Sequence, residues 1–307
     1  MRHWSNGWRR DLNPEKISIR GQLLYDEPMS RHTSLKVGGA ADLYAEPEDT
    51  DDLLTLVRGL KERQIPWLAI GRGYNLLVRD GGIRGAVISL ARFNRISEAG
   101  ERLIRAEAGA ENLALVRFAQ ERGLGGIGFI SGIPGTVGGA VKMNAGAYGS
   151  GVLERLESLT VLQGDTVAEL PREDLCYGYR HLTLPTGAIV LAALFRLVEC
   201  DPQLTEEEIR KDTDLRRSKH NVGFPSAGSF FKNPAGQAAW RLIDQAGLRG
   251  VAVGGAQVSE VHSNFLINRG EATAADFLEL AGRVKEAVFE ATGAMLEEEV
   301  RIVGEEP

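Results

Sequence analysis

A concentration of glycine constrains this 307-residue chain more than any other feature: eleven glycines lie between Gly123 and Gly151, both included. Glycine costs about 0.5–1 kcal/mol relative to alanine inside a helix or strand, so such a segment weakens regular structure unless the backbone gains something in return. Apolar residues at Ile133, Val137 and Val141 argue against a mobile loop. We therefore expect the backbone of this segment to contact a large, flat ligand closely.

A second glycine pair, Gly71 and Gly73, directly follows the apolar run Trp67 to Ile70. A turn of this kind after a strand can point several backbone N–H groups at one anion. The turn has neither the GxGxxG spacing of a dinucleotide-binding loop nor the lysine of a P-loop. On the residues alone, an anion-binding nest and an ordinary turn are equally well supported.

Apolar periodicity predicts an α+β fold. The region 49–63 has helical spacing with Asp49 or Thr50 as N-cap, and strand-like segments follow at 67–70 and 85–90. Thr205 and Glu208 have the spacing of a capping box, from which a helix would run to about residue 219. We expect domains at 1–92, 93–202 and 203–307. Further strands are expected at 103–106, 156–162, 166–170, 189–197 and 295–303, and further helices at 111–122 (with Leu113, Val116 and Phe118 inward), 238–246 and 273–292, the last ending at Gly293.

Charge, apolar runs and cysteine spacing limit the classes of partner that we expect. The net charge of -6 argues against a nucleic-acid partner, although local positive patches can still bind small anions. The N-terminus has no apolar core typical of a secretory signal, and the longest apolar run, 189–198, is interrupted by Arg196 and too short to cross a bilayer. Cys176 and Cys200 have no metal-ligand spacing, so we expect two reduced thiols. We expect a cytoplasmic monomer or weak oligomer without a metal site or a membrane partner.

Five motifs occur in a recognisable order over about residues 30–303. They are RHTSLKVGG from Arg31, NLLVRDGG from Asn75, the glycine-rich segment, YGYR from Tyr177 and PSAGSFFKNP from Pro225. In these motifs the chain closely resembles the UDP-N-acetylenolpyruvoylglucosamine reductase (UDP-N-acetylmuramate dehydrogenase) family. The resemblance implies a two-part FAD-binding region of the vanillyl-alcohol-oxidase (PCMH) type, followed by a C-terminal α+β substrate-binding domain.

The resemblance also implies a reaction in cell-wall precursor synthesis. NADPH reduces a non-covalently bound FAD, and the enolpyruvyl group of a UDP-amino sugar then takes a hydride from flavin N5 at C3 and a proton at C2. Three residues match the catalytic positions of the family, namely Arg180, Ser229 and Glu299. Lys219, Lys232 and Asn233 are candidates for the substrate diphosphate. The residues that match the FAD site are Gly71, Gly73, Tyr74, Asn75, Leu76, Ser131, Gly132, Ile133, Pro134, Gly135, Gly138, Gly139, Asn144, Ala145, Gly146 and Ala147.

The three catalytic matches also make chemical sense. Hydride addition leaves an enolate whose carboxyl group carries extra negative charge, which a guanidinium such as Arg180 can hold with two hydrogen bonds. Ser229 would protonate C2, and general acid catalysis of this kind contributes about 10²–10⁴-fold in rate. Glu299 would orient the substrate carboxylate or share its proton. Without the resemblance, the same residues read as a surface arginine, a turn serine and part of a solvated strand face.

The sequence departs from the family pattern in the first glycine turn and after YGYR. Tyr74 stands where serine is usual and Arg72 where glycine is common, so a serine hydroxyl contact to the FAD pyrophosphate is lost. The segment after Arg180 is too short for the tyrosine-bearing loop of one family branch. The chain is therefore similar to the second branch, which lacks that loop.

Two other functions compete with this reading. One is a flavin oxidase of the same FAD-binding superfamily, which passes electrons to oxygen; many such oxidases tether flavin covalently through histidine or cysteine, and no tether is identifiable in the sequence. The other is a flavin-binding or nucleotide-sugar-binding protein without turnover, against which the joint presence of Arg180, Ser229 and Glu299 argues.

Overall fold

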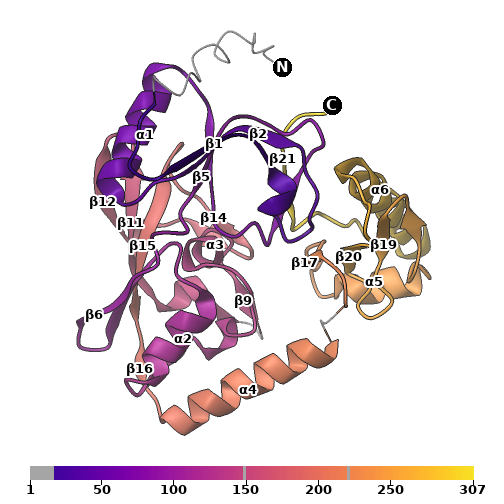
Figure 1. The fold of residues 1–307 in the computed structure, drawn as a ribbon. Coiled ribbons are helices and arrows are strands. Elements are labelled where there is room, and N and C mark those ends of the chain that lie inside the picture. Colours follow the sequence, from indigo (N-terminus) through magenta and orange to yellow (C-terminus); the bar gives the residue numbers. More distant parts are fainter. Residues whose placement is uncertain (1–16, 148–149, 220–221) are drawn as a thin grey trace. The chain divides into compact units, whose positions relative to one another are not determined.

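The computed structural model of the chain describes residues 17–147, 150–219 and 222–307 (Figure 1). It divides into two compact units, each assembled from three separate segments. Unit 1 contains the described residues up to Tyr25 together with Leu43–Arg72 and Gly85–Asp214, and unit 2 contains Asp26–Asp42, Gly73–Arg84 and Leu215–Pro307. The three contiguous domains expected from the sequence, 1–92, 93–202 and 203–307, stay a prediction.

A four-stranded sheet has the order β1-β2-β5-β3, formed by β1 (Gln22–Pro28), β2 (Ala40–Glu46), β5 (Ile83–Ser89) and β3 (Trp67–Ile70). β3 pairs with β5 in parallel. Helix α1 (Thr50–Glu62), which connects β2 to β3, begins after Asp49, whose carboxylate accepts a hydrogen bond from the Asp52 backbone N–H. The apolar stripe of α1 is buried, which confirms the helix expected at 49–63.

Unit 1 also contains an antiparallel sheet of order β12-β11-β15-β7-β6. Its strands are β6 (Ile96–Gly100), β7 (Leu103–Glu107), β11 (Leu156–Gln163), β12 (Thr166–Pro171) and β15 (Ile189–Arg196). Helix α3 (Val137–Lys142) packs against β15 and β7. These strands confirm four of the expected segments, because runs rich in β-branched and aromatic residues bounded by turns leave few alternatives.

Helix α2 (Asn112–Gln120) confirms the expected helix and the burial of Val116, but the expected burial of Leu113 was wrong. Leu115, Val116 and Ala119 are buried and Phe118 packs against the core partly buried, whereas Leu113 is 36% exposed. The correction follows from helix geometry, since positions 112, 115, 116 and 119 share one face and residue 113 points away from it.

Unit 2 contains a four-stranded antiparallel sheet and two helices. Its sheet has the order β17-β20-β19-β18, formed by β17 (Ser226–Ser229), β20 (Phe265–Asn268), β19 (Ala256–Val258) and β18 (Ala252–Val253). Helices α5 (Ala239–Gln245) and α6 (Ala274–Thr292) lie beside this sheet (Figure 1). β21 (Arg301–Val303) pairs in parallel with β4 (Leu76–Val78). The core is mainly aliphatic and includes three fully buried phenylalanines, Phe230, Phe231 and Phe277.

Helix α6 shows both a local and a long-range start signal. Thr273 and Asp276 form a capping box, and Gly293 ends the helix with a φ of 70°, as expected from the sequence. In addition, Asp80 accepts hydrogen bonds from the backbone N–H groups of Ala274 at 2.8 Å and of Ala275 at 2.9 Å. This carboxylate satisfies two of the helix's free N–H groups and lies at the positive end of its dipole.

Two expectations about the C-terminal third were wrong. The helix α4 (Pro202–Lys219) begins before the expected capping box: the Asp201 carboxylate accepts from the Gln203 N–H at 2.9 Å, and the Thr205 hydroxyl contacts Cys200 Sγ instead. Proline is favoured in the first helical turn, which explains the earlier start. The strand expected at 295–303 is limited to β21, with one isolated bridge between Phe231 and Glu298.

The remaining elements are short. No helix in the described part of the chain is long and apolar enough to cross a membrane. The short strands are β8 (Leu124–Gly125), β9 (Gly146–Ala147), β10 (Ser150–Gly151), β13 (Tyr177–Gly178), β14 (His181–Leu182) and β16 (Val198–Glu199), and the 3₁₀ turns are η2 (Met29–Arg31), η3 (Gly128–Ile130), η4 (Val152–Arg155) and η5 (Arg172–Asp174).

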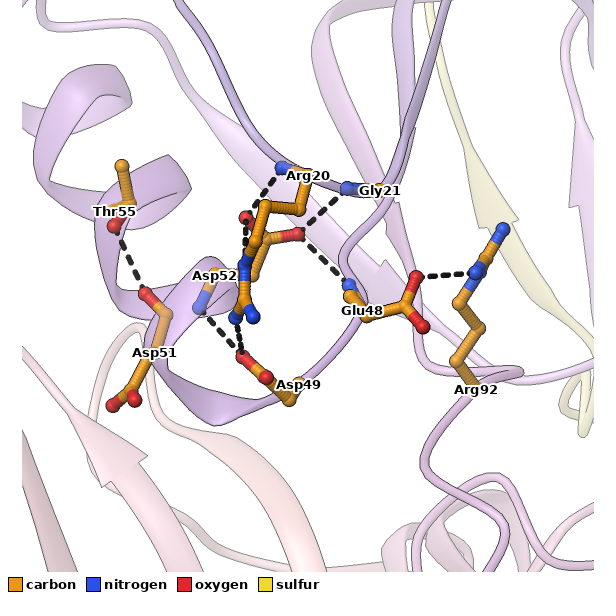
Figure 2. A network of polar contacts seen from close by, with 8 residues as sticks. All are labelled: Arg20, Gly21, Glu48, Asp49, Asp51, Asp52, Thr55 and Arg92. Atoms are coloured by element: carbon orange, nitrogen blue, oxygen red, sulfur yellow. Dashed lines mark hydrogen bonds and ion pairs between the residues drawn. The ribbon is translucent and has the colours of Figure 1, made fainter.

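A buried carboxylate joins the start of α1 to the chain before β1 (Figure 2). Asp52 is 3% exposed and accepts three backbone hydrogen bonds, from Arg20 at 2.7 Å and from Gly21 and Glu48 at 2.9 Å each. Burial raises the pKa of Asp52, but these N–H donors together with the charge of Arg20 outweigh it, and the pKa lies below its usual value. The Arg20 guanidinium also pairs with Asp49.

Candidate functional site

Unit 1 brings the two glycine-rich segments into contact at one point. A Cβ atom added to Gly71 would lie 2.4 Å from the hydroxyl oxygen of Thr136. Arg72 forms an ion pair with Glu111 at 2.6 Å, and Glu111 in turn forms an isolated β-bridge with Thr136. Only glycine at position 71 allows this approach, so the turn after β3 is fitted against the segment that precedes α3.

Three buried polar atoms around this contact have no hydrogen-bond partner in the described protein: Ser131 Oγ, Thr136 Oγ1 and Asn112 Oδ1. They belong to one neighbourhood, because Asn112 donates through Nδ2 to the carbonyl oxygen of Ile133 at 3.0 Å. A buried polar group without a partner costs about 1–3 kcal/mol. Three such groups beside close-packed backbone fit a polar ligand that completes their hydrogen bonds, as an FAD would.

Sequence reasoning missed two of these residues, Thr136 and Asn112. Thr136 lies inside the glycine-rich segment, for which the prediction rests on the glycines and not on hydroxyl groups. Asn112 lies at the start of α2, where it reads as an ordinary helix residue. Their missing hydrogen bonds become visible only in the folded chain.

The second half of the first glycine turn belongs to unit 2. Gly73 has a φ of 63°, and a Cβ atom there would lie 2.0 Å from the carbonyl oxygen of His32. Ser34 donates through its N–H to the Gly73 carbonyl oxygen at 3.1 Å and through its hydroxyl to that of Tyr74 at 3.3 Å. The RHTSLKVGG motif therefore holds the backbone of this turn, and the Tyr74 side chain is 36% exposed.

In unit 2, hydrogen bonds connect the segments that carry Ser229 and Glu299. The Glu299 N–H donates to the carbonyl oxygen of Phe230, the residue after Ser229, at 2.8 Å. Asn75 contacts the same segment twice: its Nδ2 donates to the Glu299 carbonyl oxygen at 3.0 Å, and its own carbonyl oxygen accepts from the Arg301 N–H at 3.1 Å. Ser229 and Glu299 are both partly buried. Asn75 and the segments that carry Ser229 and Glu299 are therefore joined by hydrogen bonds although they are far apart in sequence.

A buried amide fixes the strand after Ser229. Asn264 is 2% exposed, and its Nδ2 donates to the Phe231 carbonyl oxygen at 2.8 Å while its Oδ1 accepts from the Phe231 N–H at 3.0 Å. Its backbone oxygen accepts from the Phe230 N–H at 2.7 Å. The Asn264 side chain thus replaces a missing strand partner. Asn264 is not among the residues predicted from the sequence.

Arg180 lies in unit 1, in the two-residue loop between β13 and β14. It has a φ of 53°, in the left-handed region that residues other than glycine seldom adopt. Its guanidinium donates to the carbonyl oxygens of Gly146 at 2.9 Å and Asn144 at 3.5 Å. The hairpin therefore holds Arg180 against the end of the glycine-rich segment.

The candidate substrate residues have structural contacts of their own. Lys232 Nζ forms an ion pair with Glu297 at 2.5 Å. Asn233 accepts from the Ala239 N–H at 3.0 Å and so satisfies a free N–H group at the start of α5. Lys219 is the last residue of α4, and its side chain lies outside the described part of the chain.

Comparison with known proteins matches two family models to the chain. The model described as FAD binding domain matches residues 41–167, and the model described as UDP-N-acetylenolpyruvoylglucosamine reductase, C-terminal domain, matches residues 219–303. The fold class expected from the sequence, an FAD-binding region followed by a separate C-terminal α+β domain, is confirmed.

Curated relatives and a solved structure agree with these models. The UDP-N-acetylenolpyruvoylglucosamine reductase of Pelobacter propionicus is 70% identical over 96% of this chain and 100% of its own length. That of Geotalea uraniireducens is 58% identical over 94% of this chain and 96% of its own length. The crystal structure of the enzyme of the same name from Thermus caldophilus superimposes with a TM-score of 0.79 at 34% identity, covering 93% of this chain and 99% of the other.

Proposed function

The chain belongs to the UDP-N-acetylenolpyruvoylglucosamine reductase family, and on that premise we propose that it reduces the enolpyruvyl ether of UDP-N-acetylglucosamine enolpyruvate to UDP-N-acetylmuramate, with NADPH as electron donor. One observation in the structure supports this proposal above the others. Asn75 of the first glycine turn, the Ser229 strand and the Glu299 segment form one hydrogen-bonded group in unit 2. A cofactor-binding residue and two candidate catalytic residues are thereby brought together.

FAD is the cofactor, in line with the matched FAD-binding domain. The chemistry it supplies when bound is hydride transfer, first from NADPH and then to C3 of the enolpyruvyl group. We assign FAD to the residues of the two glycine-rich segments and, because of their unsatisfied oxygens, also to Thr136 and Asn112. Their unsatisfied oxygens, with that of Ser131, are available for its polar groups. These segments are tightly packed, because the Gly71 backbone lies against the Thr136 side chain and the Gly138 backbone against Ala108.

Arg180 is the residue that we assign to the substrate carboxylate. Two of its guanidinium nitrogens already donate to carbonyl oxygens of the glycine-rich segment, so the group is held in one orientation before substrate arrives. Arginine presents five N–H donors in a planar fork, a geometry that suits two-pronged hydrogen bonding to a carboxylate. A preorganised donor aimed at developing negative charge contributes about 2.7–4 kcal/mol of transition-state stabilisation.

Ser229 and Glu299 are the other two residues to which we assign catalytic roles. Ser229 gives a proton to C2 of the enolate, and Gly228, with a φ of 76°, places no side chain beside its hydroxyl. Glu299 orients the carboxylate or shares its proton. Because the Glu299 N–H is bonded to Phe230, displacement of one segment displaces the other. Lys219, Lys232 and Asn233 remain our candidates for the substrate diphosphate, with the Glu297 partner of Lys232 as a competing anion.

An anaerobic experiment with purified flavoprotein tests the reaction. The flavin is reduced with NADPH, UDP-N-acetylglucosamine enolpyruvate is added, and flavin absorbance is followed. We expect rapid return of the oxidised spectrum with formation of UDP-N-acetylmuramate. A flavin that stays reduced until air is admitted would refute the proposal and favour an oxidase.

The residue assignment has its own test. We expect Ser229→Ala to be reduced by NADPH as the parent is and to return electrons to the substrate about 10²–10⁴-fold more slowly. Ser97→Ala, in β6, is a matched control for loss of one hydroxyl elsewhere. A parental rate in Ser229→Ala would show that another group donates the proton.

A further inference from the structure

The side chain of Asn144 connects three segments around Arg180. Its Nδ2 donates to the carbonyl oxygen of Gly178 at 2.9 Å, on the strand that leads into the Arg180 loop. Its Oδ1 accepts from the N–H of Leu153 at 3.3 Å. One amide therefore links the end of the glycine-rich segment to the β13–β14 hairpin and to the turn η4.

The backbone of Asn144 contacts the same arginine. The Asn144 carbonyl oxygen lies 3.5 Å from an Arg180 guanidinium nitrogen, and the Gly146 carbonyl oxygen accepts from the other nitrogen at 2.9 Å. The contacts run in both directions: Asn144 holds the hairpin through its side chain, and the hairpin's arginine holds the Asn144 segment. The orientation of Arg180 is therefore coupled to the position of the segment 144–146, which the Asn144 side chain anchors.

Both partners have unusual backbone conformations. Asn144 has a φ of 40° and Arg180 a φ of 53°. Such conformations cost free energy and persist where surrounding contacts enforce them, often at functional sites. Asparagine tolerates this region better than most residues, which accounts for its presence at position 144. Packing around the amide is close, since a Cβ atom on Gly151 would lie 2.6 Å from Asn144 Oδ1.

We propose that Asn144 is a positioning residue for Arg180: its amide clamps the β13–β14 hairpin to the glycine-rich segment and so sets the guanidinium in place for the substrate carboxylate. The inference rests on the proposed function, in which Arg180 binds that carboxylate. It assigns to the Asn144 side chain a role separate from the FAD contact expected for this residue, which the backbone of the segment can make.

Two variants separate the parts of the clamp. Asn144→Asp keeps the left-handed preference and an acceptor for the Leu153 N–H, but replaces the donor to Gly178 with a carboxylate oxygen. Asn144→Gly keeps the conformation, adds no charge and removes both bonds. Asn94→Asp, at an exposed asparagine, controls for the added charge. Single-turnover rates per bound flavin are measured anaerobically, for reduction by NADPH and then for reoxidation by UDP-N-acetylglucosamine enolpyruvate.

We expect both Asn144 variants to slow reoxidation by the substrate more than reduction by NADPH, by a factor of up to about 100, because a misplacement of about 1 Å can cost that much. The dependence on Arg180 is tested in a double-mutant cycle with Arg180→Lys. If Asn144 acts through Arg180, Asn144→Gly slows reoxidation less than twofold (~0.4 kcal/mol) in the Arg180→Lys background. The proposal would be overturned if the rate effects of Asn144→Gly and Arg180→Lys simply multiply. It would also be overturned by equal slowing of both half-reactions, or if neither Asn144 variant retains flavin.

Hydrogen exchange supplies a readout that does not depend on the reaction. We expect amides of residues 177–182 to exchange faster in both Asn144 variants than in the parent, because the hairpin has lost its anchor. Unchanged exchange would contradict the clamp. If exchange rises while Arg180→Lys reoxidises at the parental rate, the clamp stands and the role assigned to Arg180 in the proposed function falls.

Discussion

Replacement of Asn264 by alanine is the perturbation whose effect follows most directly from the structure. The Asn264 side chain makes both hydrogen bonds of the Phe231 backbone, at 2.8 and 3.0 Å, and both residues are buried, at 2% and 0% exposure. The segment 297–299 on the other side does not compensate, because it bonds to the neighbours of Phe231. There the Glu299 N–H donates to the Phe230 carbonyl oxygen, and the Lys232 N–H donates to the Glu297 carbonyl oxygen. Truncation leaves one N–H and one C=O group buried without a partner. At about 1–3 kcal/mol each, we expect a loss of about 2–6 kcal/mol in the free energy of unfolding.

The assay is urea unfolding of parent and variant, monitored through a signal that reports on unit 2. The midpoint should fall while the dependence of the free energy on urea concentration stays the same. Asn233→Ala is the matched control: it removes an exposed asparagine that caps α5 through one bond, and its cost should be near 1 kcal/mol. A loss below about 1 kcal/mol in Asn264→Ala would refute the reasoning, because it would show that the Phe231 groups find other partners. The variant should also show slower reoxidation by substrate, since Ser229 directly precedes the released strand.

Three further perturbations test other contacts. Thr136→Val removes a hydroxyl without a protein partner; we expect unchanged stability of the FAD-free protein and about 10-fold weaker FAD binding by titration calorimetry, and equal affinity would remove Thr136 from the FAD site. Asp80→Ala removes the long-range cap of α6, and we expect a loss of about 1–2 kcal/mol in urea unfolding, with Asp80→Asn losing less; no change would mean that the capping box suffices. The pKa of Asp52 is lowered in the folded chain, so its contribution to stability is present above the unfolded value of about 3.9 and is lost as the pH falls through the folded value. Asp52→Asn should therefore lower the free energy of unfolding by at least about 1.5 kcal/mol at pH 7, and its stability should fall less than that of the parent as the pH is lowered. Parallel curves of stability against pH for the two proteins would contradict this cause.

Local sequence patterns were sufficient for elements whose signals lie within a few residues. Helix α1 after Asp49, helix α6 between Thr273 and Gly293, and the strand β3 match their expected bounds closely, because caps and apolar periodicity act over one or two turns. The same local reasoning failed where two signals competed. Thr205 has capping-box spacing, yet Asp201 and Pro202 start the helix one turn earlier.

For the candidate site, the sequence predicts a set of residues but no contacts between them. Family resemblance pointed to Arg180, Ser229 and Glu299 by their motifs. It could not show that Asn144 holds the Arg180 hairpin or that Asn75 bonds to the Glu299 segment, because such partners are separated by tens to hundreds of residues and leave no periodic trace.

What the sequence determined by itself is the class of the chain: most of its elements and its family, since each of these depends on local spacing or on motifs in fixed order. Only the tertiary structure decided which polar groups find a partner within the protein and which do not. Asn264 and Thr136 are both buried polar residues, and in sequence neither announces a partner. Folding gives Asn264 two hydrogen bonds and leaves the Thr136 hydroxyl with none. That difference arises from long-range chain packing, which brings a strand edge to one residue and a glycine turn to the other.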